Sequence, residues 1–104
     1  MTLITITRSR GHIVRVKAEG HTGYAESGSD IVCAAVSALT EAAANGLREV
    51  AGIRVKDTTR DGYKEFSIGE YNQSTDAILE TMALALKDIA NQYPRYLKTE
   101  DQTK

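Results

Sequence analysis

The sequence predicts an α+β fold: a two-layer ββαββα sandwich in which two helices cover one face of an antiparallel four-stranded sheet. Three observations predict it. Four short segments alternate apolar with polar residues, as half-buried strands do, and they form two pairs that are each joined by a turn. Two longer segments repeat apolar residues at spacings of three and four, as amphipathic helices do. One such helical segment follows each pair of strands.

The first pair of strands covers residues 2–8 and 12–18. In the first run, threonine alternates with isoleucine or leucine. In the second, valine and alanine alternate with Arg15 and Lys17. A Ser-Arg-Gly turn joins the two runs, which predicts a hairpin with one face toward solvent. We expect His12, the first residue of the second strand, to be a surface residue without a role.

The first helix is expected over residues 31–50, with Asp30 or Ser29 as its N-cap. An Asn-Gly pair ending at Gly46 interrupts the segment, but the apolar pattern keeps its phase across the pair. We therefore predict one helix in which Gly46 allows close packing, ended by an Ala-Gly pair. The apolar positions of the pattern are Val32, Val36, Leu39, Ala43, Leu47 and Val50.

The second half of the chain repeats this organisation. Residues 53–58 and 63–68 alternate again, and an Asp-Gly pair between them is typical of a tight hairpin turn. A second helix is expected from about Thr75, after an asparagine or serine cap, to the residue before Pro94. These two strands complete the predicted four-stranded sheet.

Length and composition indicate one ordinary globular domain of 104 residues, with 41% hydrophobic and 26% charged residues. We expect it to cover residues 1–98 and to be followed by a polar, frayed tail over residues 99–104. The 13 basic and 14 acidic residues give a net charge of −1, which does not favour nucleic acid as a partner. A single cysteine excludes an internal disulfide. The sequence shows neither a signal peptide nor a membrane-spanning run, so the cytoplasm is expected.

His21 and Cys33 are the candidate catalytic residues. Cys33 falls in the first turn of the predicted helix, where outward-pointing N–H groups favour a thiolate. His21 lies at the other end of the preceding glycine-rich loop and could supply the base that a nucleophilic thiol needs. Together they predict a cysteine hydrolase. The alternatives are an inert core cysteine and a histidine at the surface or in a cap.

Two neighbours of Cys33 are further candidates. We expect Asp30 to be an N-cap rather than the acid of a triad, because capping explains both its type and its place. Ser37 lies on the same side of the helix as Cys33 and could touch substrate or orient His21. Backbone N–H groups at the start of the helix, including that of Cys33, are expected to stabilise an oxyanion.

The loop between the two candidates contains Gly20, Gly23 and Gly28. These glycines could let the loop open for a peptide and close over it, or they could only satisfy turn geometry. Tyr24 in the same loop could pack against an aromatic substrate residue or could anchor the loop. We predict no cofactor and no metal, because His21, Cys33 and Asp30 give fewer ligands than the four of a structural zinc site.

Residues 20–37 read GHTGYAESGSDIVCAAVS. This stretch resembles the signature of the bacterial ribosomal-processing cysteine proteases, the Prp family. The resemblance extends over essentially the whole chain, including the Tyr-Pro-x-Tyr sequence at 93–96. It implies that His21 and Cys33 are the catalytic pair and that the protein is a homodimer. It also implies a peptidase that removes a short N-terminal extension from ribosomal large-subunit protein twenty-seven, after a hydrophobic stretch that contains aromatic residues.

Other functions stay open on the residues alone. A non-enzymatic, ribosome-associated binding module would dock on a protein partner through its sheet, and alkylation of its inert cysteine would leave its activity unchanged. A thiol redox sensor is less favoured, because the chain has no second cysteine to resolve a disulfide. Either the exposed sheet face or the pair of helices could form the surface of a homodimer.

Overall fold

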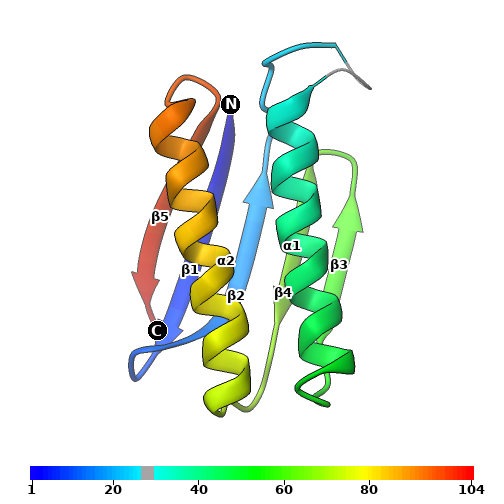
Figure 1. Cartoon of the computed structure of the whole chain (residues 1–104), viewed down its shortest axis with the longest axis vertical. Coiled ribbons are helices and arrows are strands. Elements are labelled where there is room, and N and C mark those ends of the chain that lie inside the picture. Colours follow the sequence, from blue (N-terminus) through cyan, green and yellow to red (C-terminus); the bar gives the residue numbers. More distant parts are fainter. Residues whose placement is uncertain (27–29) are drawn as a thin grey trace.

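The computed structural model describes residues 1–26 and 30–104. Over these residues the order is ββαββαβ, with both helices on one face of a five-stranded sheet (Figure 1). The predicted α+β class and the placement of the helices on one face are confirmed. The prediction of a four-stranded, purely antiparallel sheet is wrong. The elements are β1 (Thr2–Ser9), β2 (His12–Glu19), α1 (Ile31–Glu49), β3 (Lys56–Arg60), β4 (Tyr63–Ser67), α2 (Gln73–Gln92) and β5 (Leu97–Thr103).

The fifth strand accounts for this difference. The strand order is β3-β4-β2-β1-β5, and β5 pairs with β1 in parallel while the other neighbours are antiparallel. The pairing runs from Thr2 opposite Leu97 to Arg8 opposite Thr103. The expectation of a frayed tail after Lys98 is therefore wrong. Only one residue of β5, Leu97, is apolar and buried, so the segment lacks the alternation that marks a strand.

Both predicted helices are present. Helix α1 continues through the Asn-Gly pair, as expected, and Asp30 is its N-cap. Helix α2 begins two residues before the predicted start, at a capping box between Asn72 and Thr75. Gly46 faces α2, and a Cβ atom at Gly46 would lie 3.5 Å from Ile78, an ordinary van der Waals distance. Close helix packing therefore does not require glycine at this position.

Both hairpins form, and their turns have the expected chemistry. Arg10 and Gly11 have φ angles of 52° and 85° in the β1–β2 turn, a combination that two-residue hairpin loops favour. The β3–β4 turn places Gly62 at φ 68°. Strand β3 begins later than predicted, at Lys56 instead of Ile53, and all its residues are exposed at the edge of the sheet.

The hydrophobic core lies between the sheet and the helices. Each apolar side chain that becomes fully buried there contributes about 1.5–3 kcal/mol to stability. The opposite face of the sheet carries charged pairs such as Arg15 with Glu65 and Lys17 with Glu19. The fully buried apolar residues of the core are Ile4, Ile6, Ile13, Val16, Val32, Leu47, Phe66, Leu79, Leu86 and Leu97.

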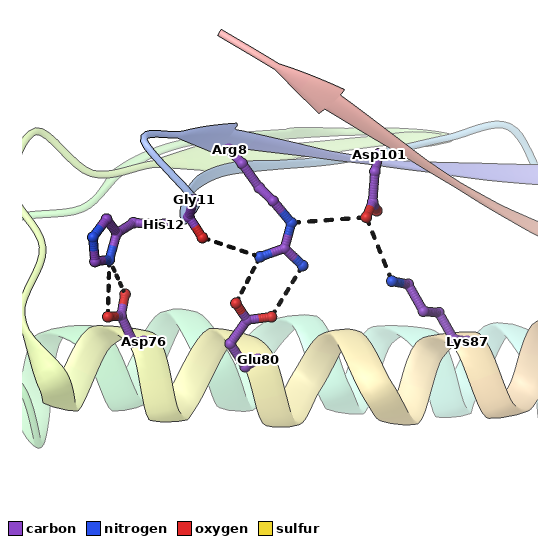
Figure 2. A network of polar contacts seen from close by, with 7 residues as sticks. All are labelled: Arg8, Gly11, His12, Asp76, Glu80, Lys87 and Asp101. Carbon is purple, nitrogen blue, oxygen red and sulfur yellow. Dashed lines mark hydrogen bonds and ion pairs between the residues drawn. The ribbon is translucent and has the colours of Figure 1, made fainter.

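A charged network joins α2 to β1 and β5 (Figure 2). The guanidinium of Arg8 donates to both carboxylate oxygens of Glu80, at 2.6 and 3.0 Å, and its Nε atom is 3.7 Å from Asp101. Asp101 also lies 3.5 Å from Nζ of Lys87 on α2. These contacts give β5 a second attachment besides its ladder with β1, because Asp101 belongs to β5.

His12 has a structural contact that the sequence did not indicate. Its Nδ1 atom is 2.9 Å from both carboxylate oxygens of Asp76 in the first turn of α2 (Figure 2). Its ring also stacks on that of Tyr71, with 3.8 Å between the centroids. His12 therefore fastens the start of β2 to the start of α2, and it lies at the opposite end of β2 from His21.

Candidate active site

His21 and Cys33 reach the candidate site from different elements. His21 follows the last residues of β2, and Cys33 lies in the first turn of α1. Both side chains line a cavity of about 150 Å³, and both also line a second cavity of about 410 Å³. Separation along the chain could not establish this proximity. The structure therefore brings the two candidates to one cleft.

Cys33 is exposed at the edge of the core, as predicted. Its neighbours on the buried side of α1, Val32 and Val36, have exposed fractions of only 1% and 6%. A cysteine packed as a core residue would occupy that buried side instead. The thiol of Cys33 is thus open to the cavities while it lies at the N-terminal end of α1, where the helix dipole favours an anion.

Asp30 joins the segment after His21 to the start of α1. One carboxylate oxygen of Asp30 accepts a hydrogen bond from the N–H of Cys33 at 2.9 Å, which confirms the predicted N-cap. The other accepts from the hydroxyl of Thr22 and from the N–H of Tyr24, at 3.2 Å in the latter case. Desolvation raises the pKa of Asp30, but these hydrogen bonds outweigh it and hold the pKa below its ordinary value of 3.8.

The geometry at the N-cap does not support one expectation about the mechanism. The N–H of Cys33 was expected to help stabilise an oxyanion, but it donates to Asp30 instead. The N–H of Ala34 donates to the backbone carbonyl of Asp30 at 3.0 Å. In this state of the protein, neither group is free to bind a substrate oxygen.

The turn between β3 and β4 supports His21 from the other side. The N–H of Gly20 donates to the carbonyl of Gly62 at 2.8 Å, and Nε2 of His21 lies 3.8 Å from the carboxylate of Asp61. A Cβ atom at Gly62 would lie only 2.9 Å from Nε2 of His21. The sequence indicated the Asp-Gly pair only as a turn, and no local signal placed that turn beside His21.

The glycines and Ser37 have different relations to the cleft. Gly20 and Ser37 line the smaller cavity, and Gly23 lines the larger one. Gly20 must be glycine, because a Cβ atom there would lie 2.4 Å from the carbonyl oxygen of Met1. Gly23 has a φ of 70° with open space around it. Gly28 lies outside the described residues.

Tyr24 makes the contacts of a loop anchor. Its ring meets those of Tyr93 and Tyr96 edge to face, with centroid separations of 5.5 and 5.2 Å. Such aromatic pairs contribute about 0.5–1.5 kcal/mol beyond their buried area. The three rings attach the first part of the loop to the segment that joins α2 to β5. This supports the anchoring interpretation of Tyr24 over packing against substrate.

Several residues of the smaller cavity were not predicted. Arg60 and Lys64 bring two cations to the side formed by β3 and β4, and the guanidinium of Arg60 lies 3.9 Å from the ring centre of Tyr63. These residues have no distinctive spacing relative to His21 or Cys33, so only the pairing of β2 with β4 reveals them. The unpredicted residues of this cavity are Thr2, Ala18, Thr22, Val36, Thr40, Arg60, Gly62, Tyr63 and Lys64.

Residues 1–26 and 30–104 contain no group of three or more histidine, cysteine, aspartate or glutamate side chains that could hold a metal ion. Within the same residues, neither helix has the length and apolar character needed to span a bilayer.

The chain is similar to known proteases over nearly its full length. A family model described as "Cysteine protease Prp" matches residues 1–98. The ribosomal processing cysteine protease Prp of Bacillus subtilis (strain 168) is 33% identical over 106 residues, covering 94% of this chain and 95% of the relative. The protein of the same description from Mycoplasma pneumoniae is 30% identical over 86% of this chain and 89% of the relative.

Solved structures give the same comparison. The structure of an essential ribosomal processing protease Prp from S. aureus, in complex with a covalently linked product peptide, has a TM-score of 0.91 and 27% identity. The match covers 98% of this chain and 100% of that one. A second structure of that protease, in complex with a substrate peptide, has a TM-score of 0.85 and 26% identity over the same shares of the two chains.

Proposed function

The chain belongs to the Prp family of ribosomal processing cysteine proteases, and from that premise we propose that it removes a short N-terminal extension from ribosomal large-subunit protein twenty-seven. The reaction runs through an acyl-enzyme formed by a dyad of Cys33 and His21. The single observation that carries this proposal is the shared cleft: an exposed thiol at the start of α1 and the imidazole of His21 line the same two cavities.

The proposed reaction has two steps. The thiolate of Cys33 attacks the scissile carbonyl carbon, and the imidazolium of His21 gives its proton to the leaving amine as the C–N bond breaks. In the second step, neutral His21 takes a proton from water, which attacks the thioester and releases the carboxylate product and the free thiol. Each role needs an accessible side chain at the cleft, which both residues provide.

The direct test is incubation with the precursor of ribosomal protein twenty-seven, followed by mass spectrometry. The wild type should produce one shortened protein and one peptide, and Cys33→Ala should produce neither. Replacing this exposed cysteine should cost at most about 1 kcal/mol in stability, so the variant should fold. Cleavage by Cys33→Ala at the wild-type rate would show that the nucleophile is another residue.

The role of His21 is tested separately, through the chemistry of the thiol. His21→Ala should remove turnover, and the pH dependence of iodoacetamide labelling of Cys33 should move to higher pH, because the imidazolium partner of the thiolate is gone. An unchanged labelling midpoint would mean that only the helix dipole acts on Cys33. A wild type that cleaves no precursor, and that binds its protein partner equally well before and after alkylation of Cys33, would favour the ribosome-associated binding module instead.

A homodimer is the proposed assembly, with the helices as the shared surface. The outer face of the sheet carries charged pairs, whereas a shallow apolar groove of about 420 Å³ runs between α1 and α2. Val50 lines this groove and is 77% exposed. Analytical ultracentrifugation should show a dimer for the wild type and a monomer for Val50→Glu. A monomeric wild type would refute this assembly.

The proposed partner is the N-terminal extension peptide of the ribosomal large-subunit protein, and no membrane is needed. Nucleic acid is not needed either, since the net charge of −1 gives no general attraction to phosphate. The cytoplasm is the proposed compartment, because ribosomal proteins are made and assembled there. Because nucleic acid is not needed, a precursor without RNA should be cleaved as fast as one supplied with ribosomal RNA.

A further inference from the structure

Asp61 faces the proposed catalytic histidine from an element that carries neither member of the dyad. Its Oδ2 atom lies 3.8 Å from Nε2 of His21, and it belongs to the turn between β3 and β4. The Asp61 side chain is 97% exposed and that of His21 is 70% exposed. A carboxylate at this distance can attract a protonated imidazole without being part of the core.

The backbone fixes how this turn meets His21. The hydrogen bond from Gly20 to the carbonyl of Gly62 ties the residue before His21 to the residue after Asp61. Gly62, at φ 68°, leaves the space that a side chain would take from the His21 ring. Asp61 and His21 are thus each one residue from the same backbone hydrogen bond, which keeps their backbones close together.

The other charged groups around His21 already contact other residues. Arg60 and Lys64 line the smaller cavity with His21, where Arg60 stacks on Tyr63 and Lys64 lies 4.0 Å from Asp57. From the start of α1, Asp30 and Cys33 line the larger cavity, and the Asp30 carboxylate already accepts three hydrogen bonds. Within the described part of the chain, Asp61 is therefore the carboxylate placed to pair with His21.

We propose that Asp61 is a positioning residue that holds Nε2 of His21 and stabilises its imidazolium form, leaving Nδ1 for the thiolate of Cys33. A carboxylate beside one ring nitrogen fixes both the orientation and the protonation pattern of a histidine. The inference rests on the proposed function, because it assigns His21 its catalytic role. Since both groups are exposed, loss of the carboxylate should lower kcat/KM by about two- to five-fold at low salt.

The test measures kcat/KM against pH for the wild type, Asp61→Asn and Asp61→Glu, with a fluorogenic peptide that spans the cleavage site of the precursor. Asp88→Asn is the matched control, since it removes the same charge from an exposed position on α2. Asp61→Asn should lower kcat/KM and move the alkaline limb of the profile to lower pH. Asp61→Glu should restore most of the activity, and high salt should shrink the difference from wild type.

A second measurement separates this inference from the proposed function. Iodoacetamide labelling of Cys33 against pH reports the thiolate–imidazolium pair whether or not peptide is cleaved. Failure of the wild type to cleave would overturn the proposed function, and the labelling profiles would still decide the role of Asp61. Asp61 has no such role if Asp61→Asn matches the wild type in the labelling profile. A loss of kcat/KM in Asp61→Asn that Asp61→Glu does not restore and that high salt does not reduce would also overturn the proposal. Such a loss would reflect only a distorted turn.

Discussion

The hydroxyl of Thr22 donates a hydrogen bond to the carboxylate of Asp30 across the loop that separates the two candidate catalytic residues. Thr22 follows His21 directly, is 3% exposed, and lines both cavities. Asp30 uses its other carboxylate oxygen to cap the helix that carries Cys33. One carboxylate therefore sets the position of the His21 segment relative to Cys33, in addition to starting the helix.

This double role predicts that capping and positioning can be separated by substitution. Asp30→Asn keeps a good N-cap but presents a donor in place of the oxygen that accepts from Thr22. Thr22→Val removes the donor at nearly constant volume. Both should reduce peptide turnover while costing less stability than Asp30→Ala, which should lose about 1 kcal/mol for the cap alone.

The control is Asn72→Ala, which removes the equivalent cap of α2. It should lower the free energy of unfolding by a similar amount while the catalytic rate of the folded enzyme is retained. Urea unfolding and peptide turnover give the two quantities. Turnover by Asp30→Asn and Thr22→Val equal to that of the wild type would mean that Asp30 acts only as a cap.

The pKa of Asp30 predicts a loss of stability in acid. Because hydrogen bonds hold this pKa below its ordinary value of 3.8, the ionised form is favoured by folding. The contribution is fully present above the unfolded-state pKa and disappears as the pH falls through the lower, folded-state pKa. The difference in free energy of unfolding between wild type and Asp30→Asn should therefore be constant near neutral pH and should shrink below about pH 4. Urea titrations at several pH values would contradict this if the difference stayed constant in acid.

Local patterns predict most of the fold, but they miss β5. Helices α1 and α2 and both hairpins have apolar periodicity and turn residues within a short window, so the sequence reveals them directly. Strand β5 has a single buried apolar residue, Leu97, and its parallel partner β1 lies at the other end of the chain. Strand β5 forms because it pairs with β1 and because of contacts such as that between Arg8 and Asp101. No local sequence pattern encodes these interactions.

The residues of the candidate site also fall into those that local sequence predicts and those that only the fold brings together. His21 and Cys33 lie within one short motif, and Asp30 could be predicted as a cap from its place before the helix. Asp61 and Gly62 approach His21 only because β2 pairs with β4 and Gly20 bonds to the turn. The hydrogen bond of Cys33 to Asp30 also follows from predicted capping, yet its consequence for an oxyanion appears only once the atoms are placed.

Because the last residues of the chain form β5 and pair with β1, we expect them to contribute to stability. Deleting residues 99–104 would remove most of the ladder with β1 and the contacts of Asp101 with Arg8 and Lys87. It would also leave one side of β1 as an unpaired edge. We expect a clear fall in the melting temperature and increased aggregation, measured by calorimetry and light scattering. A chain with the Asp101→Asn substitution alone should lose much less, and a truncated chain as stable as the wild type would contradict a structural role for β5.

Gly23 lies where it could affect the access of peptide to the cleft. Gly23 has a φ of 70° and lines the larger cavity, with no atom near the place of a Cβ. Valine at this position would strain the backbone of the loop without a direct clash. If the loop must open for an extended peptide, Gly23→Val should impair peptide turnover more than iodoacetamide labelling of Cys33, since a small reagent needs less space. Gly52→Val is the matched control, because Gly52 has a φ of 68° and equally open surroundings after the far end of α1. Equal losses in both assays for Gly23→Val would mean that the loop positions the dyad instead of admitting substrate. Wild-type values in both assays would mean that the loop is only a connection.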